Sequence, residues 1–173
     1  MLLQDDDGHL RALDWQEYEE RMRRLLRLHY GADGVELRPG DGGGAAVESL
    51  RRYFAGDLGA LAALRVATGG TPFQRRVWHA LREIPVGTTI SYADLARRIG
   101  KPAAFRAVGL ANGANPVGIV VPCHRVIGSN ASLTGYGGGI ERKRWLLAHE
   151  GADVARTEGA RRVSFPEQLQ LVR

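Results

Sequence analysis

The single cysteine of this chain, Cys123, stands directly before His124 in the segment VPCHRV, residues 121–126. A thiol becomes a strong nucleophile when it loses its proton, and an imidazole can accept that proton. Side chains of adjacent residues in extended backbone point to opposite sides, so a bridging water or a sharp turn must connect the two groups. A histidine base also needs an acceptor behind its ring, and Glu150 is the candidate. The structural alternative is a buried, unreactive cysteine.

Other kinds of site are less well supported. The histidines are scattered, and no Cys/His group has zinc-ligand spacing, so we expect no metal. Papain-like peptidases also combine Cys with His, but there the two lie far apart in sequence. The glycine-rich segment GSNASLTGYGGG lacks the spacing of a P-loop or a dinucleotide-binding loop, and no cofactor is expected.

The composition is that of a globular protein with a basic surface. The chain has 173 residues, 44% of them hydrophobic, and a formal net charge of +5, with the basic excess mainly in the later part. Such a surface favours a polyanion such as nucleic acid. The first ten residues do not form a signal peptide pattern, and no apolar run approaches the ~20 residues of a membrane span. We therefore expect a cytoplasmic protein with no membrane association.

The elements that must position the cysteine begin with an amphipathic helix within residues 14–31. Asp14 is its predicted N-cap, Glu17 completes a capping box and Gly31 ends it. A second short helix is expected over residues 47–56. The segment ATGG, residues 67–70, then joins the first part of the chain to the second.

The second part has denser signals. Thr71 with Gln74, and Ser91 with Asp94, each have the pattern of a capped helix start. A further helix begins near Pro102 and ends near Asn115. The two short helices on either side of the Gly-containing turn at residue 100 predict a helix-turn-helix.

The second helix of that motif has an unusual face. Arg106 shares it with three small residues, Ala103, Gly109 and Gly113, so one guanidinium projects from a nearly bare surface. Phe105 and Val108 on the other side are predicted core residues. One interpretation is close approach to another macromolecule, and the alternative is tight helix packing with Arg106 in a salt bridge.

After this motif, GIVV (residues 118–121) is predicted to be a short buried strand that leads to Cys123. The last helix, IERKRWLLAHEG, is expected to turn Trp145, Leu146 and Leu147 inward and its basic residues outward. Glu150 lies at the end of that helix, where only the fold can bring it close to His124.

These segments together resemble the O6-alkylguanine-DNA alkyltransferases. The resemblance is carried by VPCHRVIGSN, by SYADLARRIGKPAAFRAVGLANGANP before it and by TGYGGGIERKRWLLAHEG after it, and it runs from about Thr71 to Gly151. It implies an α+β fold with a small N-terminal α/β domain (residues 1–66) of unclear role. A mostly helical C-terminal domain (67–154) would hold the helix-turn-helix and the strand leading to the cysteine, and a tail (155–173) would follow.

The resemblance also implies the chemistry. Cys123 would take the alkyl group from guanine O6, activated through a chain from Glu150 to His124 and a water. Tyr92 and the backbone N–H of Gly137 would stabilise the departing guanine, the carbonyls of Cys123 and Val126 would select it, and Asn115 would serve as a hinge. Other implied pocket residues are Val126, Tyr136, Gly137, Gly138 and Gly118.

On the DNA side, the resemblance implies that Arg106 fills the space left by a flipped-out nucleotide. Its helix would enter the minor groove with the small residues Ala103, Gly109 and Gly113, and Ser91 would also contact DNA. The product is a thioether that the chain cannot cleave, so each molecule would act once. The implied partner is double-stranded DNA containing O6-alkylguanine, bound by a monomer without metal or cofactor.

Two features depart from the family pattern or extend it. Ala131 occupies a position where relatives commonly have Gly, which costs on the order of 1 kcal/mol if the position needs φ > 0. The small residues Gly118 and Gly137–Gly139 suggest tolerance of alkyl groups larger than methyl. Rival functions are a DNA-binding sensor without transfer activity, a helix-turn-helix transcription regulator and a thiol hydrolase.

Overall fold

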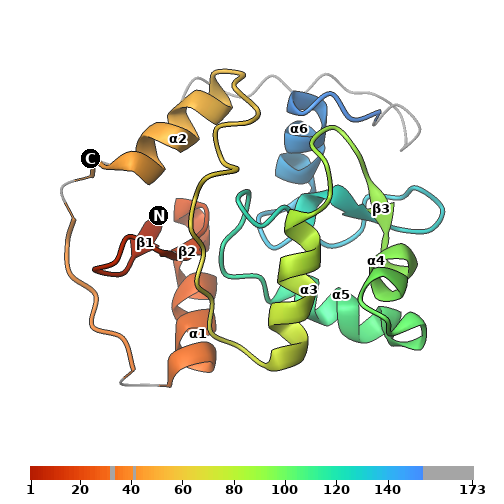
Figure 1. Cartoon of the computed structure of the whole chain (residues 1–173), viewed down its shortest axis with the longest axis horizontal. Helices are drawn as coiled ribbons and strands as arrows, with labels where there is room; N and C mark the ends of the chain where they lie inside the picture. Colours follow the sequence, from red (N-terminus) through yellow and green to blue (C-terminus); the bar gives the residue numbers. More distant parts are fainter. Residues whose placement is uncertain (32–33, 41, 154–173) are drawn as a thin grey trace.

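The computed structural model describes residues 1–31, 34–40 and 42–153, so the predicted tail lies outside the described residues. The first half contains an antiparallel pair of strands and two helices, joined by a short 3-10 turn (Figure 1). These elements are β1 (Leu2–Gln4), β2 (Leu10–Leu13), η1 (Gln16–Tyr18), α1 (Glu19–Tyr30) and α2 (Ala45–Phe54).

The second half is mostly helical, as expected, with two very short strands that pair in parallel. Its elements are α3 (Pro72–Arg82), β3 (Ile90–Ser91), α4 (Tyr92–Arg98), η2 (Pro102–Ala104), α5 (Phe105–Gly113), η3 (Cys123–Arg125), β4 (Val126–Ile127) and α6 (Ile140–His149). Figure 1 places the hairpin and α1 on one side of the molecule and α3, α4 and α5 on the other.

Two predicted helix starts are confirmed. Thr71 and Gln74 form a reciprocal capping box at α3, and Ser91 and Asp94 form one at α4. Each box satisfies backbone N–H groups that the first helical turn leaves unpaired. The helix that follows Gly100 comes in two pieces, η2 and α5, which complete the predicted helix-turn-helix.

The predicted start of the first helix is wrong. Trp15 rather than Asp14 occupies the N-cap of η1, and α1 begins only at Glu19. The Asp14 carboxylate, whose side chain is only 5% exposed, forms an ion pair with Arg21 instead. A nearly buried carboxylate is stabilised more by a guanidinium than by a helix N–H group, which explains the change of partner.

The predicted strand before Cys123 is also wrong. Residues 118–121 form turns, with Val121 N–H donating to the carbonyl of Val117 and Ile119 at φ +67°. Leu13 of β2 holds the start of this segment, since its N–H donates to Pro116 O and its carbonyl accepts from Gly118 N–H, each at 2.8 Å. The strand next to the cysteine, β4, therefore follows Cys123 and does not lead to it.

One hydrophobic core runs through both halves of the chain. It includes residues from the hairpin and α2 as well as from α3, α4, α5 and α6, among them Leu10, Leu50, Tyr53, Val77, Leu81, Leu95, Val108 and Leu146. The Trp78 indole N–H also donates to the carbonyl of Ala111, which ties α3 to α5 at 2.8 Å. The N-terminal half is thus packed against the elements that carry the cysteine. Among the described helices, none has the length and apolar character that crossing a membrane requires.

Candidate active site

Cys123 begins the 3-10 turn η3, so the backbone between it and His124 is tightly turned and not extended. The Cys123 side chain is nearly buried at 6% exposed, and His124 is completely buried. A sharp turn at this point is one of the two arrangements, besides a bridging water, that could connect the adjacent side chains. It leaves both side chains in the interior, next to the end of α6.

The Glu150 carboxylate accepts hydrogen bonds from His124 and from the next residue, Arg125. Its Oε1 lies 3.0 Å from His124 Nε2, and its two oxygens accept from Arg125 Nη2 and Nε, each at 2.8 Å. Arg125 also donates to the carbonyl of Ile84, two residues after the end of α3. These hydrogen bonds and charges hold the pKa of Glu150 well below its usual value in spite of burial. The structure thus brings together the predicted His124–Glu150 pair.

The contact with Glu150 fixes the tautomer of His124. An ionised carboxylate can only accept, so Nε2 carries the proton and Nδ1 has a free lone pair. Nδ1 is buried and has no hydrogen-bond partner among the described residues. Burial lowers the pKa of His124 although Glu150 opposes this shift, so the ring is neutral at physiological pH. The neutral ring offers Nδ1 as a proton acceptor.

Burial raises the pKa of the Cys123 thiol. A hydrogen bond with Asn115 and the positive charges of Lys143 and Arg21 act in the opposite direction. The resting sulfur is therefore a thiol, and its deprotonation needs a base at the moment of reaction.

Two asparagines hold the segment that carries the cysteine. Asn115 is buried, its side-chain amide donates to the carbonyl of Val121 at 2.8 Å, and its Oδ1 accepts from Val117 N–H at 3.0 Å. Asn112, on the buried side of α5, donates to the carbonyl of Cys123 at 3.4 Å. The end of α5 is thus bonded directly to the turn before Cys123, which is the position that a hinge between the two would need.

Two of the predicted site residues, Tyr92 and Tyr136, lie close enough to Cys123 to interact with it electrostatically. Burial raises the pKa of both Tyr92 and Tyr136, and the negative charge of a Cys123 thiolate adds to each shift. The carbonyl of Val126 already accepts from the buried ammonium of Lys143 at 2.6 Å. A carbonyl has two lone pairs, so this bond leaves Val126 one acceptor site.

Two of the predicted pocket glycines are small for a reason that the sequence did not indicate. A side chain at Gly137 would collide with the Arg21 guanidinium at 2.5 Å, and one at Gly138 would collide with the Trp15 indole at the same distance. A Cβ at Gly118 would lie 3.3 Å from the carbonyl of Leu13. The missing side chains at positions 137 and 138 make room for Arg21 and Trp15. They are therefore no argument for tolerance of a larger alkyl group.

Several residues that sequence reasoning missed belong to this site. Arg21 on α1 donates to the carbonyls of Gly113 and Asn115 at 2.8 and 3.2 Å, and Tyr53 on α2 donates to Glu150. Arg21 and Tyr53 lie in the N-terminal part of the chain, where no sequence motif marks them as site residues. Lys143 was expected to point outward with the other basic residues of the last helix. It is fully buried instead, with its pKa lowered to about 8 by desolvation, because two carbonyls bind its ammonium.

The face of α5 that carries Arg106 is open to solvent. Arg106, Ala103 and Gly113 are exposed, whereas Gly109 is half-buried, and a Cβ there would lie 3.9 Å from the ring of Tyr92. Ser91 exchanges hydrogen bonds with Asp94 at the start of α4.

Phe105 corrects one expectation for this helix. It is 47% exposed, and its ring lies 5.7 Å from the Arg106 guanidinium carbon, whereas Val108 is buried as predicted. Leu110, one turn after Arg106, is 78% exposed. The helix therefore presents apolar side chains beside the arginine, and the surface is less bare than the sequence suggested.

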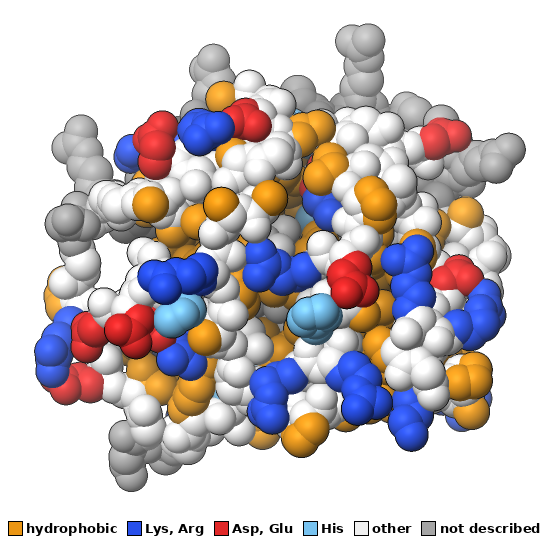
Figure 2. Space-filling view, viewed as in Figure 1, with side chains coloured by type: hydrophobic (Ala, Val, Ile, Leu, Met, Phe, Trp, Pro, Cys, Tyr) orange, Lys and Arg blue, Asp and Glu red, His pale blue; other side chains and the backbone are white. Residues whose placement is uncertain are grey.

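Basic side chains gather on the same side of the molecule. Figure 2 shows Lys and Arg over the region where Figure 1 has α3, α4 and α5. The exposed basic residues of these elements and of the turn between them are Arg75, Arg76, Arg82, Arg97, Arg98, Lys101 and Arg106. Such a concentration of positive charge attracts a polyanion.

Ala131 adopts the left-handed conformation, with φ +63°. This conformation costs an alanine about 1–2 kcal/mol, and the extra freedom of glycine in the unfolded chain offsets part of that. We expect Ala131→Gly to raise the free energy of unfolding by about 0.5–1 kcal/mol, measured by chemical denaturation. The control is Ala148→Gly on the exposed side of helix α6, which should lower it by a similar amount. A destabilised Ala131→Gly variant would contradict the assignment of strain to this position.

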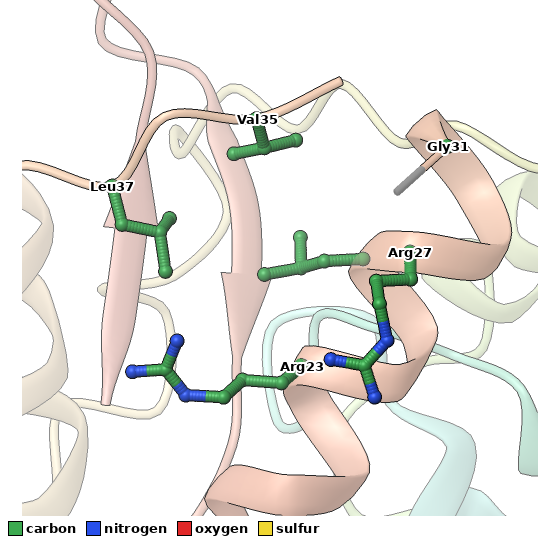
Figure 3. Close-up of a pocket in the computed structure, with 6 residues that line it drawn as sticks. Arg23, Arg27, Gly31, Val35 and Leu37 are labelled. Carbon is green, nitrogen blue, oxygen red and sulfur yellow. The ribbon is translucent and has the colours of Figure 1, made fainter. Parts of the chain in front are cut away.

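Two other features lie away from the cysteine. Figure 3 shows a pocket between α1 and the segment after it, and it contains none of the predicted site residues. Its lining residues are Arg23, Leu26, Arg27, Gly31, Val35 and Leu37. At the hairpin turn, ligand atoms of Asp5, Asp7 and His9 lie within 4.8 Å of one another, but Asp5 is already paired with Arg11 and His9.

Comparisons with known proteins identify relatives of this chain. Residues 72–152 match the family model described as the 6-O-methylguanine DNA methyltransferase, DNA binding domain. The methylated-DNA–protein-cysteine methyltransferase of Salmonella typhimurium is 54% identical over 147 residues, which is 85% of this chain and 86% of that protein. Its counterpart in Mycobacterium bovis is 52% identical over 128 residues, 73% of this chain and 77% of that protein.

Solved structures give the same result. The crystal structure of Mycobacterium tuberculosis OGT in complex with DNA has a TM-score of 0.68 and 43% identity, covering 90% of this chain and 86% of that one. The O6-methylguanine-DNA methyltransferase of Pyrococcus kodakaraensis has a TM-score of 0.69 and 30% identity, covering 87% and 89%. With His124 paired to Glu150 in the turn that begins at Cys123, and with relatives matched over most of its length, the chain belongs to the methylated-DNA–protein-cysteine methyltransferase family.

Proposed function

We propose that this protein repairs O6-alkylguanine in duplex DNA by transferring the alkyl group irreversibly to its own Cys123, after the damaged nucleotide has been flipped out of the helix. The observation that carries the proposal is the buried Glu150–His124 pair beside the protein's single cysteine. The relatives' names support methyl transfer to a protein cysteine, and the exposed basic surface supports DNA as the substrate.

The reaction starts with the thiol proton. Nδ1 of His124 is the free nitrogen of a neutral ring, and it accepts the Cys123 proton through one water. Glu150 stabilises the imidazolium that forms, because its carboxylate stays ionised under the influence of Arg125. The thiolate exists only during the reaction, which protects the sulfur from other electrophiles.

In the transfer step, the sulfur lone pair forms a bond to the alkyl carbon and the carbon–O6 bond breaks. The electron pair of that bond stays on guanine, which gains a proton, so the net change is thiol plus alkylguanine to thioether plus guanine. The Tyr92 hydroxyl and the Gly137 N–H donate hydrogen bonds as negative charge builds on the base. The remaining lone pair of the Val126 carbonyl accepts from the guanine amino group, and the Cys123 carbonyl accepts from it by giving up its 3.4 Å bond from Asn112.

The protein binds DNA with the α4–α5 helix-turn-helix, and α5 lies in the minor groove. Arg106 occupies the space of the flipped nucleotide, and Ala103, Gly109 and Gly113 allow the helix backbone to approach the groove. Ser91 contributes at the start of α4. We further propose that the protein acts as a monomer in the cytoplasm, with residues 67–154 as the DNA-binding and transfer unit and 1–66 as a supporting domain.

Arg106→Ala is expected to slow transfer from duplex O6-methylguanine by roughly ten- to a hundredfold, because stabilisation of the flipped state is worth a few kcal/mol. Transfer from the free O6-methylguanine base should be unchanged, since a free base needs no flipping. Arg98→Ala, which removes the same charge from exposed α4, is the control. Equal losses on duplex and free base would contradict the role of Arg106.

The overall proposal is tested by incubating the protein with a duplex containing O6-methylguanine and measuring its intact mass. We expect one methyl group per molecule, located on the peptide that contains Cys123, and no further turnover when fresh duplex is added. Repeated turnover would indicate a thiol hydrolase. DNA binding without a gain in mass would indicate a sensor or a transcription regulator.

A further inference from the structure

Tyr53 connects the N-terminal half of the chain to the site. It lies on α2, its side chain is 1% exposed, and its hydroxyl donates to Glu150 Oε1 at 2.7 Å across 97 residues of sequence. The other groups around Glu150 come from the second half: His124 and Arg125 from η3. Tyr53 is thus the contribution of the first half to this carboxylate.

The phenol shares its acceptor with the histidine. Glu150 Oε1 accepts from Tyr53, from His124 Nε2 and from Arg125 Nη2, at 2.7, 3.0 and 2.8 Å. An oxygen with several donors is fixed in position, and its negative charge is divided among them. Removing the Tyr53 donor would therefore change both where Oε1 lies and how much charge it offers to the imidazole.

Packing holds the Tyr53 ring in the orientation that this bond requires. The Tyr53 ring packs edge-on against the rings of His149 and Phe54, with 5.1 and 5.3 Å between ring centroids. The backbone carbonyl of Tyr53 also accepts from His149 Nε2 at 2.7 Å. Burial and the neighbouring carboxylate raise the pKa of Tyr53 far above its usual value. The phenol therefore stays protonated and acts only as a donor toward Glu150.

We propose that Tyr53 is a positioning residue for the alkyl transfer, holding Glu150 Oε1 against His124 so that Nδ1 is presented to the Cys123 thiol. The proposal rests on the function proposed above for the His124–Glu150 pair. It gives the N-terminal half a defined part in the chemistry, through one hydroxyl.

Tyr53→Phe keeps the ring and removes the hydroxyl. Without this donor, Oε1 carries more charge toward His124 and favours its protonated form, so the pKa of His124 rises. The other charged and titratable groups that face this network are Arg125, Lys143, Cys123, Tyr136 and His149, and the substitution leaves all of them in place. A smaller fraction of the molecules then has a neutral His124 ring at low pH, so the acidic limb of the rate profile moves to higher pH.

The test is a single-turnover measurement with saturating O6-methylguanine duplex over a range of about pH 5.5 to 9, a range that spans the unperturbed histidine pKa. The amplitude counts folded, active molecules, whereas the rate constant reports the chemistry. We expect Tyr53→Phe to keep its amplitude and to lose roughly tenfold in rate at the acidic end, with a smaller loss at the basic end. The imidazole resonances of His124, followed by NMR, should titrate at higher pH than in the wild type.

Tyr30→Phe is the matched control, because Tyr30 also lies in the first half of the chain and its hydroxyl also forms a hydrogen bond outside that half, accepting from Gly69 N–H at 2.8 Å, but it is not among the donors to Glu150. It should keep the wild-type rate profile. If Tyr53→Phe loses amplitude only, or if its profile and His124 titration match those of Tyr30→Phe, the role of Tyr53 is structural and the inference is wrong. A wild-type protein that is not alkylated at all would instead refute the proposed function.

Discussion

Cys123→Ser is expected to abolish alkyl transfer, with a loss of at least about a thousandfold, which is the scale of effect when a nucleophile is removed. A serine hydroxyl has the size to occupy the nearly buried position but is a weak nucleophile without much stronger activation. No other cysteine exists in the chain to replace it. The measurement is the intact mass after incubation with the methylated duplex, at several protein-to-DNA ratios.

The same variant should still bind duplex DNA, because the exposed face of α5 and the basic residues around it are unchanged. Fluorescence anisotropy with a labelled duplex separates the two effects, since Arg106→Ala is expected to impair binding to the lesion and Cys123→Ser is not. Residual methylation of Cys123→Ser would mean that another residue accepts the methyl group, and the assignment of the nucleophile would be wrong.

Glu150→Gln is expected to have the second largest effect, on both stability and rate. An amide offers one acceptor oxygen where the carboxylate served Tyr53, His124 and Arg125, and it leaves the guanidinium of Arg125 without a counter-charge. Breaking a buried ion pair in this way costs about 3–5 kcal/mol of unfolding free energy. Transfer should slow by about a hundredfold or more, because a wrongly oriented histidine is a poor base.

Chemical denaturation and single-turnover rates measure the two losses. The control is Glu141→Gln on the same helix, whose carboxylate is 62% exposed and pairs with Arg144 at the surface. Exposed pairs contribute about 0–1 kcal/mol, so this variant should behave nearly as the wild type. Equal stability of the two variants would show that the buried network contributes little.

The pH dependence of stability has a defined sign. The pKa of Glu150 is lower in the folded protein than in the unfolded chain, so the unfolded state takes up a proton first as the pH falls. The stabilisation is complete above the unfolded pKa of about 4.3 and is lost as the pH falls towards the folded value. Glu150→Gln should therefore lose less stability than the wild type between about pH 5 and 3.

The local elements of the second half could be predicted from sequence because their signals act over three or four residues. The capping pairs Thr71–Gln74 and Ser91–Asp94 form as expected, since each partner lies within one helical turn of the other. The predicted N-cap role of Asp14 was wrong, because its carboxylate pairs with Arg21, seven residues later, and does not cap the helix start.

Two predictions were wrong because long-range contacts determine the structure at those positions. GIVV has a strand-like composition, but pairing with Leu13 and the bonds of Asn115 hold that region in turns. The sequence predicts Lys143 to be a surface residue, but its ammonium is buried and donates to two backbone carbonyls. Neither outcome is encoded in the neighbouring residues, so a periodicity argument could not find it.

The primary structure alone predicted the reactive group, since the one cysteine is followed by a histidine within a set of segments that resembles a known family. The folded chain decided what surrounds that group. Hydrogen bonds and steric fit depend on distances in space, so only tertiary packing could bring Tyr53 to Glu150 and Arg21 to Gly137, from a half of the chain that carries no motif.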